Sequence, residues 1–358
     1  MSAERPAIAY VALGGTIASL PASATGGGGG GESGGGSGGG PGVRPALTAA
    51  DLVAGVPELE AVADLAAQTF RTVSSYEITL RDLLDLVPLL RAAVDAGARG
   101  VVVSQGTDTI EETAFVLDLL WDRPEPVVVT GAMRNPSLPG ADGPANVLAS
   151  VQLAAHRDAR DCGVLVCLGD EVHAARYVHK AHTSSPSTFH SPGLGPIGWV
   201  AEGRPVIALR PTRRAHLDVA GVRESEELPR VPIVKLGLGD DGVLLEAVRD
   251  RGCDGVVIEG LGGGHVPAAT LPFIADLLER GPVVLASRTG SGEVLATTYG
   301  SPGAEIDLLD RGVIRAGALD GLKARLLLIL VMAAGGDRAQ ILELFALVGT
   351  TTGPVARD

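Results

Sequence analysis

The chain has 358 residues, of which 46% are hydrophobic and only 3% aromatic, and its formal net charge at pH 7 is −13. Its length suggests two domains, and its composition favours a core of Ala, Val and Leu, as in parallel sheets covered by helices. The acidic balance argues against a nucleic-acid partner, because phosphate contacts need clustered Lys and Arg, and no apolar run reaches the ~18–20 residues of a membrane helix.

The N-terminal residues and the cysteines predict a cytoplasmic protein. The first six residues contain neither a basic region nor a long apolar run, so no signal peptide is expected. Three cysteines are an odd number in a long chain, which fits a reducing compartment. Cys162 and Cys167 flank or begin an apolar stretch, so we interpret them as core thiols rather than as metal ligands.

The first predicted strand, residues 8–13, ends in Gly14, Gly15 and Thr16. A tract of almost pure glycine follows at residues 25–42, and such a tract cannot bury apolar surface. We expect a mobile loop there. It is either a slack linker or a lid over the turn that carries Thr16.

Strand-like and helix-like segments then alternate. Apolar runs and helical periodicity predict strands at residues 68–73, 100–104, 127–130 and 164–169, and helices at 47–53, 80–96, 110–121 and 142–156. Thr48 is a suitable N-cap for the first of these helices. Residues 172–211 read as irregular or β-like.

A segment rich in charge and proline marks the boundary between domains. We expect an N-terminal catalytic domain at residues 1–212, a linker at 213–232 and a C-terminal domain at 233–358. Beyond the linker, short elements alternate regularly: strands at 233–236, 255–259 and 283–286, and helices at 242–251, 268–279, 322–334 and 338–345. The predicted fold is α/β, with two three-layer α/β/α domains: a larger N-terminal one with a mostly parallel sheet and a smaller C-terminal one with a parallel sheet.

Three glycine-bearing turns follow strands in the first domain, at residues 14–16, 106–109 and 131–133. Ligands bind at the carboxyl ends of parallel strands, so these turns would bring Thr16, Thr107, Asp108 and free backbone N–H groups into one crevice. A hydroxyl nucleophile needs a base and donors for its oxyanion, and the turn at Ala132 can supply a donor. Hydrolysis is therefore the leading function, although each residue alone also fits a turn or helix cap.

Lysine is rare in this chain, with three residues against twenty-six arginines. A partly desolvated Lys can release its proton whereas Arg cannot, so Lys180 is either a proton shuttle near Thr107 or a solvated surface charge. His173, His179 and His182 lack the spacing of a zinc site, so no metal is expected.

Glycine-rich turns also follow strands of the second domain, at residues 260–265 and 290–292. They do not match the dinucleotide-binding pattern, so we interpret them as connecting turns or pocket walls and expect no cofactor. From the residues alone, Glu305 reads as a surface acid.

Taken together, these segments resemble the bacterial-type L-asparaginases, which are amidohydrolases that convert asparagine to aspartate and ammonia. The resemblance covers nearly the whole chain. It rests first on residues 13–19 (LGGTIAS) and 105–114 (QGTDTIEETA), which match two family signatures, and then on 131–134, 141–146, 191–192 and 195–196.

The resemblance implies roles for individual residues. The catalytic residues would be Thr16, the nucleophile that forms an acyl-enzyme, and a second constellation of Thr107, Asp108 and Lys180. The substrate-binding residues would be Ser75 for the α-carboxylate, Asp108 and Glu305 for the α-ammonium, and Ala132 for the oxyanion through its backbone. The family needs no cofactor, and its usual assembly is a tetramer, a dimer of dimers in which the counterpart of Glu305 enters a neighbouring subunit's site.

Two features depart from the family pattern. The loop after the first Thr normally carries a Tyr, but no Tyr occurs between Tyr10 and Tyr76. Tyr76, next to Ser75, is a candidate replacement. His265 stands where many relatives have an Asn that supports the neighbouring site, so the preference between asparagine and glutamine stays open.

Three other functions remain open. The glutaminase subunit of a tRNA-dependent amidotransferase would normally add an N-terminal domain and a basic docking surface. A non-catalytic amino-acid-binding or regulatory module would keep the pocket without turnover. A nucleotide-dependent oxidoreductase would need nicotinamide binding, and the glycine-rich turns are the only sequence feature that favours it.

Overall fold

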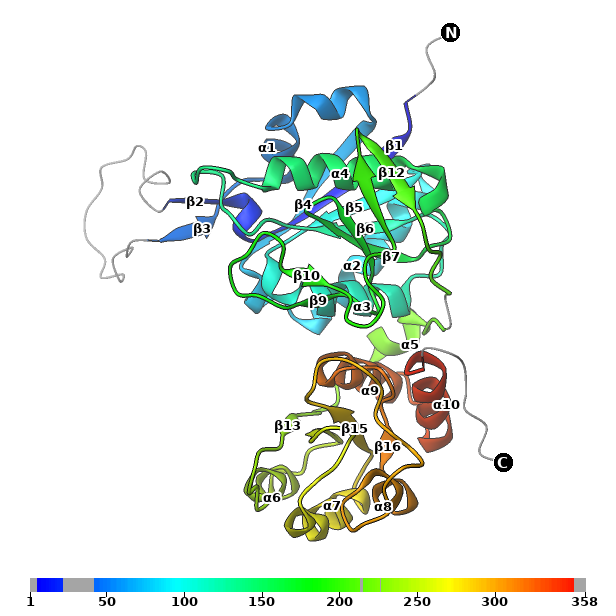
Figure 1. Cartoon of the computed structure of the whole chain (residues 1–358). Helices are drawn as coiled ribbons and strands as arrows, with labels where there is room; N and C mark the ends of the chain where they lie inside the picture. The colour runs from blue at the N-terminus through cyan, green and yellow to red at the C-terminus, as the bar shows by residue number, and fades with distance from the viewer. Residues whose placement is uncertain (1–4, 22–41, 213–214, 226, 351–358) are drawn as a thin grey trace, which may run out of the picture. The chain divides into compact units, whose positions relative to one another are not determined.

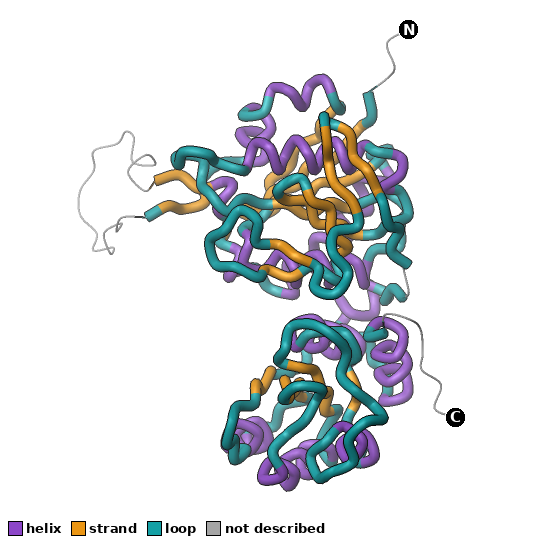
Figure 2. The backbone as a smooth tube through the Cα atoms, viewed as in Figure 1, coloured by secondary structure: helices purple, strands orange, loops and turns teal. Residues whose placement is uncertain are grey.

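The computed structural model describes residues 5–21, 42–212, 215–225 and 227–350 (Figures 1 and 2). Two compact units, Met1–Arg213 and Arg214–Asp358, divide the chain. Across the described ranges, no helix has both the length and the hydropathy to span a membrane.

The N-terminal unit is built on an eight-stranded sheet with the order β12-β11-β8-β7-β6-β5-β1-β4. Its parallel part consists of β1 (Ala7–Gly14), β4 (Asp64–Val73), β5 (Gly100–Ser104), β6 (Val127–Thr130) and β7 (Val164–Leu168). An antiparallel edge consists of β8 (Glu171–Ala174), β11 (Gly198–Ala201) and β12 (Arg204–Ile207). The strands β5, β6 and β7 are buried along their whole length, as expected for parallel strands covered on both faces.

Helices cover both faces of this sheet, so the unit has three layers (Figure 1). One layer holds α1 (Ala49–Ala54) and α4 (Gly143–Ala155), and the other holds α2 (Leu80–Asp95) and α3 (Ile110–Leu120). Thr48 caps α1 as predicted, in a capping box with Asp51. The single-turn 3-10 helices are Thr16–Ala18, Pro57–Ala61, Ser75–Glu77, Thr107–Thr109 and Arg157–Ala159.

Two small antiparallel pairs lie outside the main sheet. β2 (Ser19–Pro21) pairs with β3 (Val43–Pro45), and β9 (His179–Lys180) pairs with β10 (Phe189–His190). Apart from Gly42, the glycine-rich tract at residues 25–42 lies outside the described residues, and its role as linker or lid stays a prediction.

The C-terminal unit has a parallel sheet of β13 (Ile233–Lys235), β14 (Val256–Gly260), β15 (Val283–Ser287) and β16 (Ile314–Arg315), in that order. Its helices are α5 (Val219–Glu224), α6 (Val243–Asp250), α7 (Leu271–Leu278), α8 (Glu305–Asp310), α9 (Gly321–Ala333) and α10 (Arg338–Val348), and Ala268–Thr270 is a 3-10 turn. The α/β class with a larger and a smaller parallel sheet is therefore confirmed.

Three elements of the second unit differ from the sequence expectations. Residues 213–232 contain α5, in which Val222 is fully buried, so this segment is not a bare linker. α8 and β16 were not expected, because six and two residues are too few to show a period.

Candidate active site

The segments after β4, β1, β5 and β6 lie at one edge of the main sheet, because these four strands are parallel neighbours. They carry Ser75, Thr16, Thr107 and Ala132. Four loops that are far apart in sequence therefore share the carboxyl edge, where open α/β sheets bind ligands.

The first two glycine turns are in direct contact. Gly15 has a φ of +84°, and a Cβ atom there would lie 1.9 Å from the backbone nitrogen of Gly106. A Cβ atom on Gly106 would lie 2.7 Å from Ser75 Oγ. Thr16, which is half-buried, directly follows this contact. Glycine is thus required here by backbone conformation and by close approach.

The third turn also reaches the second. A Cβ atom on Gly131 would lie 2.6 Å from the carbonyl oxygen of Gln105 and 3.2 Å from Thr107 Cγ2. The three turns singled out in the sequence therefore pack around one point of the sheet edge.

Lys180 reaches this point from β9. Its ammonium donates to Thr107 Oγ1 at 3.0 Å and to Asp108 Oδ1 at 2.6 Å. The Lys180 side chain is only 13% exposed, whereas that of Asp108 is 57% exposed. The interpretation of Lys180 as a solvated surface charge is therefore wrong, because β9 turns it inward.

Ser75 joins the same network. Its hydroxyl donates to Asp108 Oδ2 at 3.3 Å and accepts from the Asp108 N–H at 3.3 Å, while its carbonyl accepts from Thr109 Oγ1 at 3.1 Å. Ser75 is buried, and the adjacent Tyr76 is 71% exposed. The structure thus gathers Ser75, Thr107, Asp108 and Lys180 into one hydrogen-bonded group.

Asp142 holds the turn that follows β6. Its Oδ2 accepts from the N–H of Met133 at 2.9 Å, and its Oδ1 accepts from the N–H of Arg134 at 2.8 Å. Ala132, just before them, is fully buried in the same hydrophobic cluster as Ile17. An alanine methyl has no polar chemistry, so Ala132 can act on a substrate only through its backbone.

Asn146 ties the same turn to the next strand. Its Nδ2 donates to the Gly131 carbonyl at 3.0 Å and to Asp142 Oδ2 at 3.2 Å, and its Oδ1 accepts from the Gly169 N–H at 3.0 Å. Only two asparagines occur in the chain, and the other, Asn135, lies in the loop between β6 and α4. Sequence reasoning assigned no role to Asp142 or Asn146, although their spacing of four on one helix end was visible.

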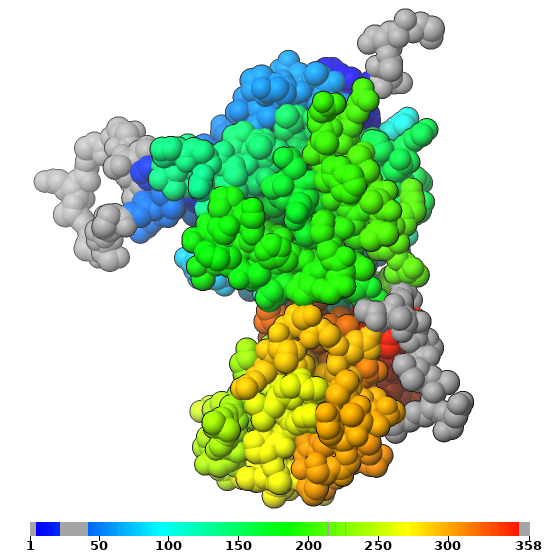
Figure 3. Space-filling model, viewed as in Figure 1, coloured from blue at the N-terminus to red at the C-terminus, as the bar shows by residue number. Residues whose placement is uncertain are grey.

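An apolar cavity lies beside the Thr16 turn, between α1 and the loop that follows β6. It is lined chiefly by Ile17, Leu47, Leu52, Val56, Pro136, Pro144 and Val147. These two segments lie side by side in the space-filling view (Figure 3). The wall of the cavity thus includes the residue next to Thr16.

Glu305 belongs to the C-terminal unit, where it begins α8 and is fully buried. Its Oε1 accepts from the N–H groups of Thr298 and Tyr299 at 2.9 and 2.6 Å, and its Oε2 lies 3.0 Å from His265 Nε2. Burial alone would raise the pKa of this carboxyl, but the backbone N–H groups of Tyr299, Glu305 and Thr298 and the His265 ring together lower it. The expectation of a surface acid is therefore wrong.

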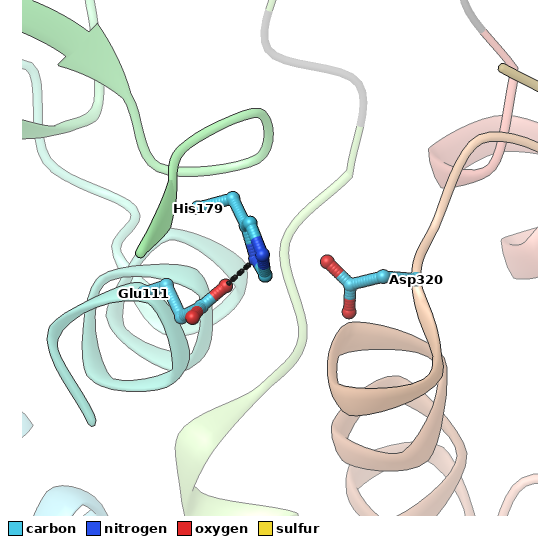
Figure 4. Close-up of side chains that lie close together, drawn as sticks. All are labelled: Glu111, His179 and Asp320. Atoms are coloured by element: carbon cyan, nitrogen blue, oxygen red, sulfur yellow. Dashed lines mark hydrogen bonds and ion pairs between the residues drawn. The ribbon is translucent and has the colours of Figure 1, made fainter. Parts of the chain in front are cut away.

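The histidines near β9 have partners within the fold. His179 Nδ1 lies 2.8 Å from Glu111 Oε2, and the two side chains point at each other (Figure 4). His173 is fully buried with its Nδ1 2.9 Å from Ser191 Oγ, and burial lowers its pKa. His182 Nδ1 accepts from two backbone N–H groups of the following turn.

Comparisons with known proteins match nearly the whole chain to asparaginases. Residues 7–213 match the family described as Asparaginase, N-terminal, and residues 230–345 match the Glutaminase/Asparaginase C-terminal domain. The chain is 33% identical over 342 residues to "L-asparaginase 2" of Escherichia coli, covering 95% of this chain and 92% of that one. It is 36% identical over 350 residues to "Probable L-asparaginase" of Deinococcus radiodurans, covering 96% and 98%. The crystal structure of a probable cytoplasmic L-asparaginase from Campylobacter jejuni superposes with a TM-score of 0.81 at 28% identity, covering 95% and 99%.

Proposed function

This chain belongs to the bacterial-type L-asparaginase family, and on that basis we propose that it hydrolyses the side-chain amide of L-asparagine to L-aspartate and ammonia. One observation about the site carries the proposal. The Lys180 ammonium lies within hydrogen-bonding distance of both Thr107 Oγ1 and Asp108 Oδ1, at the strand end next to the Thr16 turn.

Two acyl-transfer steps account for the reaction. In the first, Thr16 Oγ attacks the carboxamide carbon, and the tetrahedral intermediate expels ammonia and leaves an ester on Thr16. In the second, water attacks that ester and releases aspartate with the free hydroxyl. Each step needs a group that first removes a proton from the attacking oxygen and then protonates the leaving group.

In our proposal, Thr107, Asp108 and Lys180 carry out these proton transfers. The Lys180 side chain is 13% exposed, and its Nζ lies 2.6 Å from Asp108 Oδ1 and 3.0 Å from Thr107 Oγ1. In our proposal, a Lys at this position exchanges a proton with the reacting groups through Thr107 Oγ1. Arg could not, because it keeps its proton at working pH.

Substrate recognition would use groups around the same edge. In our proposal, Ser75 binds the α-carboxylate, Asp108 binds the α-ammonium, and the Ala132 backbone stabilises the developing oxyanion. Glu305 of a second copy completes the ammonium site, within the homotetramer, a dimer of dimers, that the resemblance to the family implies. A cytoplasmic location is supported by the three free cysteines.

Ammonia release from asparagine and glutamine, measured side by side, tests the function. The wild type should release ammonia, and Thr16→Ala and Thr107→Ala should each lose about 10²-fold or more in kcat while circular dichroism shows an intact fold. Aspartate binding by calorimetry should persist in both variants. Binding without turnover in the wild type would instead indicate a regulatory module, and nicotinamide binding would indicate an oxidoreductase.

A further inference from the structure

The strand that carries Lys180 has little sheet support. β9 is two residues long, and in the described part of the chain it pairs only with β10, which is equally short. Such a ribbon is too small to fix a side chain by backbone pairing alone. Yet the Lys180 ammonium must stay near 3 Å from Thr107 Oγ1 for a proton to pass between them.

A buried carboxylate meets this ribbon from the helix α3. Glu111, which is 4% exposed, places Oε2 2.8 Å from the Nδ1 of His179 and accepts the backbone N–H of Lys180 on Oε1 at 3.3 Å. Figure 4 shows the Glu111 carboxylate and the His179 ring facing each other across the gap between α3 and the strand. One carboxylate thus contacts both residues of β9.

The position of Glu111 in the chain makes these contacts informative. Glu111 is the second residue of α3, and the turn Thr107–Thr109 runs directly into this helix. Thr107 and Asp108 are therefore joined to Glu111 by one short, regular stretch of backbone. A carboxylate is costly to bury unless it is well bonded, so the Glu111 contacts hold it against β9 rather than leaving it free to turn to water.

We propose that Glu111 is a positioning residue for Lys180. It locks the two-residue strand β9 to the start of α3 and so sets the distance between the Lys180 ammonium and Thr107 Oγ1. The inference deepens the proposed function and rests on it, because Lys180 is one of the proposed catalytic residues. Glu111 itself is assigned no contact with the substrate. Sequence reasoning gave Glu111 no role. The available signal was a charged residue between Ile110 and Thr113, two positions of α3 that are buried.

Three variants separate positioning from general stability. Glu111→Ala removes both contacts and should lower kcat on asparagine about 10- to 100-fold with KM changed less than about threefold, since misplacing a reacting group by ~1 Å costs about that much. Glu111→Gln keeps an oxygen for the Lys180 N–H and an amide that can face His179, so it should retain kcat within about fivefold. Asp118→Ala is the matched control, because Asp118 on the same helix accepts the N–H of Val164 at 2.9 Å, away from β9.

Asp118→Ala should lower the melting temperature about as much as Glu111→Ala and leave kcat within about twofold. Equal losses of kcat in the Glu111→Ala and Asp118→Ala variants would overturn the inference, and so would an unchanged kcat in Glu111→Ala. A crystal structure of Glu111→Ala gives a readout independent of activity. Lys180 Nζ beyond hydrogen-bonding distance of Thr107 Oγ1 supports the inference, and an unchanged distance overturns it. Absence of hydrolysis in the wild type would overturn the proposed function, and the crystal readout would still decide the placement of Lys180.

Discussion

Lys180 and Glu305 show how single charged groups are handled in this fold. Lys180 is mostly shielded and bonds a hydroxyl and a carboxylate, while Glu305 is fully buried and bonds two backbone N–H groups and an imidazole. Neither is isolated from polar partners, as expected for buried charges. Substitutions of these two residues should therefore act through charge and proton exchange rather than through packing.

Replacement of Lys180 by Met should lower kcat by about 10²- to 10⁴-fold, because the ring of His179, the other residue of β9, is bonded to Glu111 rather than to Thr107. Lys180→Arg keeps the charge near Asp108 but cannot give up a proton, so it should be nearly as inactive. Steady-state ammonia release measures both, with the melting temperature as the check on folding. Near-normal turnover in either variant would remove Lys180 from the proton-transfer steps.

Glu305 predicts a pH-dependent stability. Its pKa is lowered in the folded chain because the N–H donors of Tyr299 and Thr298 and the His265 ring outweigh the effect of burial. The carboxylate therefore stabilises the fold above the unfolded pKa of about 4.3, and this contribution is lost as the pH falls through the lower folded pKa. In urea unfolding, the free-energy gap between wild type and Glu305→Gln should be largest above about pH 5 and shrink below about pH 4.

The exposed glutamate Glu279, at the end of α7 in the same unit, provides the control for that titration. Glu279→Gln changes an exposed side chain and should alter the unfolding free energy less than Glu305→Gln does. A gap for Glu305→Gln that stays constant from pH 3 to 7 would contradict the assignment.

At the scale of elements, two turns of the N-terminal unit depend on glycine for separable reasons: the turn after β1 contains Gly15, and the turn between α2 and β5 contains Gly97. Gly15 combines a positive φ with close approach to Gly106, whereas Gly97 has a φ of +108° and open space around its missing Cβ. The pair therefore distinguishes backbone strain from steric exclusion within one domain.

Gly97→Ala should destabilise the protein by about 1–2 kcal/mol, the cost of a left-handed alanine. Gly15→Ala adds overpacking against Gly106 and should cost about 3 kcal/mol or more, together with most of the activity. Urea unfolding measures the first effect and ammonia release the second. Equal losses of unfolding free energy in the two variants would mean that the contact between the turns at Gly15 and Gly106 can open without penalty.

The helix α4 acts on the site through its first turns. Asn146 bonds the carbonyl of Gly131 and the N–H of Gly169, and so holds the turn that contains Ala132. We predict that Asn146→Ala lowers kcat about tenfold with KM nearly unchanged, because an oxyanion donor acts in the transition state. Asn135→Ala is the control, since the side-chain oxygen of the half-buried Asn135 accepts from the N–H and the hydroxyl of Ser137, within its own loop. A rise in KM at constant kcat would point to ground-state binding instead.

At the scale of the whole molecule, the proposed site residues come from both units, most of them from the N-terminal one. Ser75, Thr107, Asp108 and Lys180 lie in the N-terminal unit, and Glu305 lies in the C-terminal unit. Our proposal assigns Glu305 to the site of a neighbouring copy. It therefore makes an intact site a property of the oligomer rather than of one chain.

Subunit mixing tests this sharing. Thr16→Ala and Glu305→Ala chains should each be nearly inactive alone. After co-refolding in equal amounts, mixed dimers would contain one site with both groups intact, and about a quarter of wild-type activity should return. No recovery, with light scattering showing that mixed oligomers form, would indicate that Glu305 serves its own chain or none.

Local patterns in the sequence determined the elements that a short window can report. The fully apolar runs at residues 100–104 and 127–130 became β5 and β6 with the predicted bounds, and Thr48 became a cap, because burial and capping depend on neighbours in the chain. Only the tertiary structure brought Lys180 to Thr107, which is 73 residues away, because strand order decides which loops meet. It also turned Glu305 inward through bonds to backbone N–H groups, which carry no side-chain signature in the sequence.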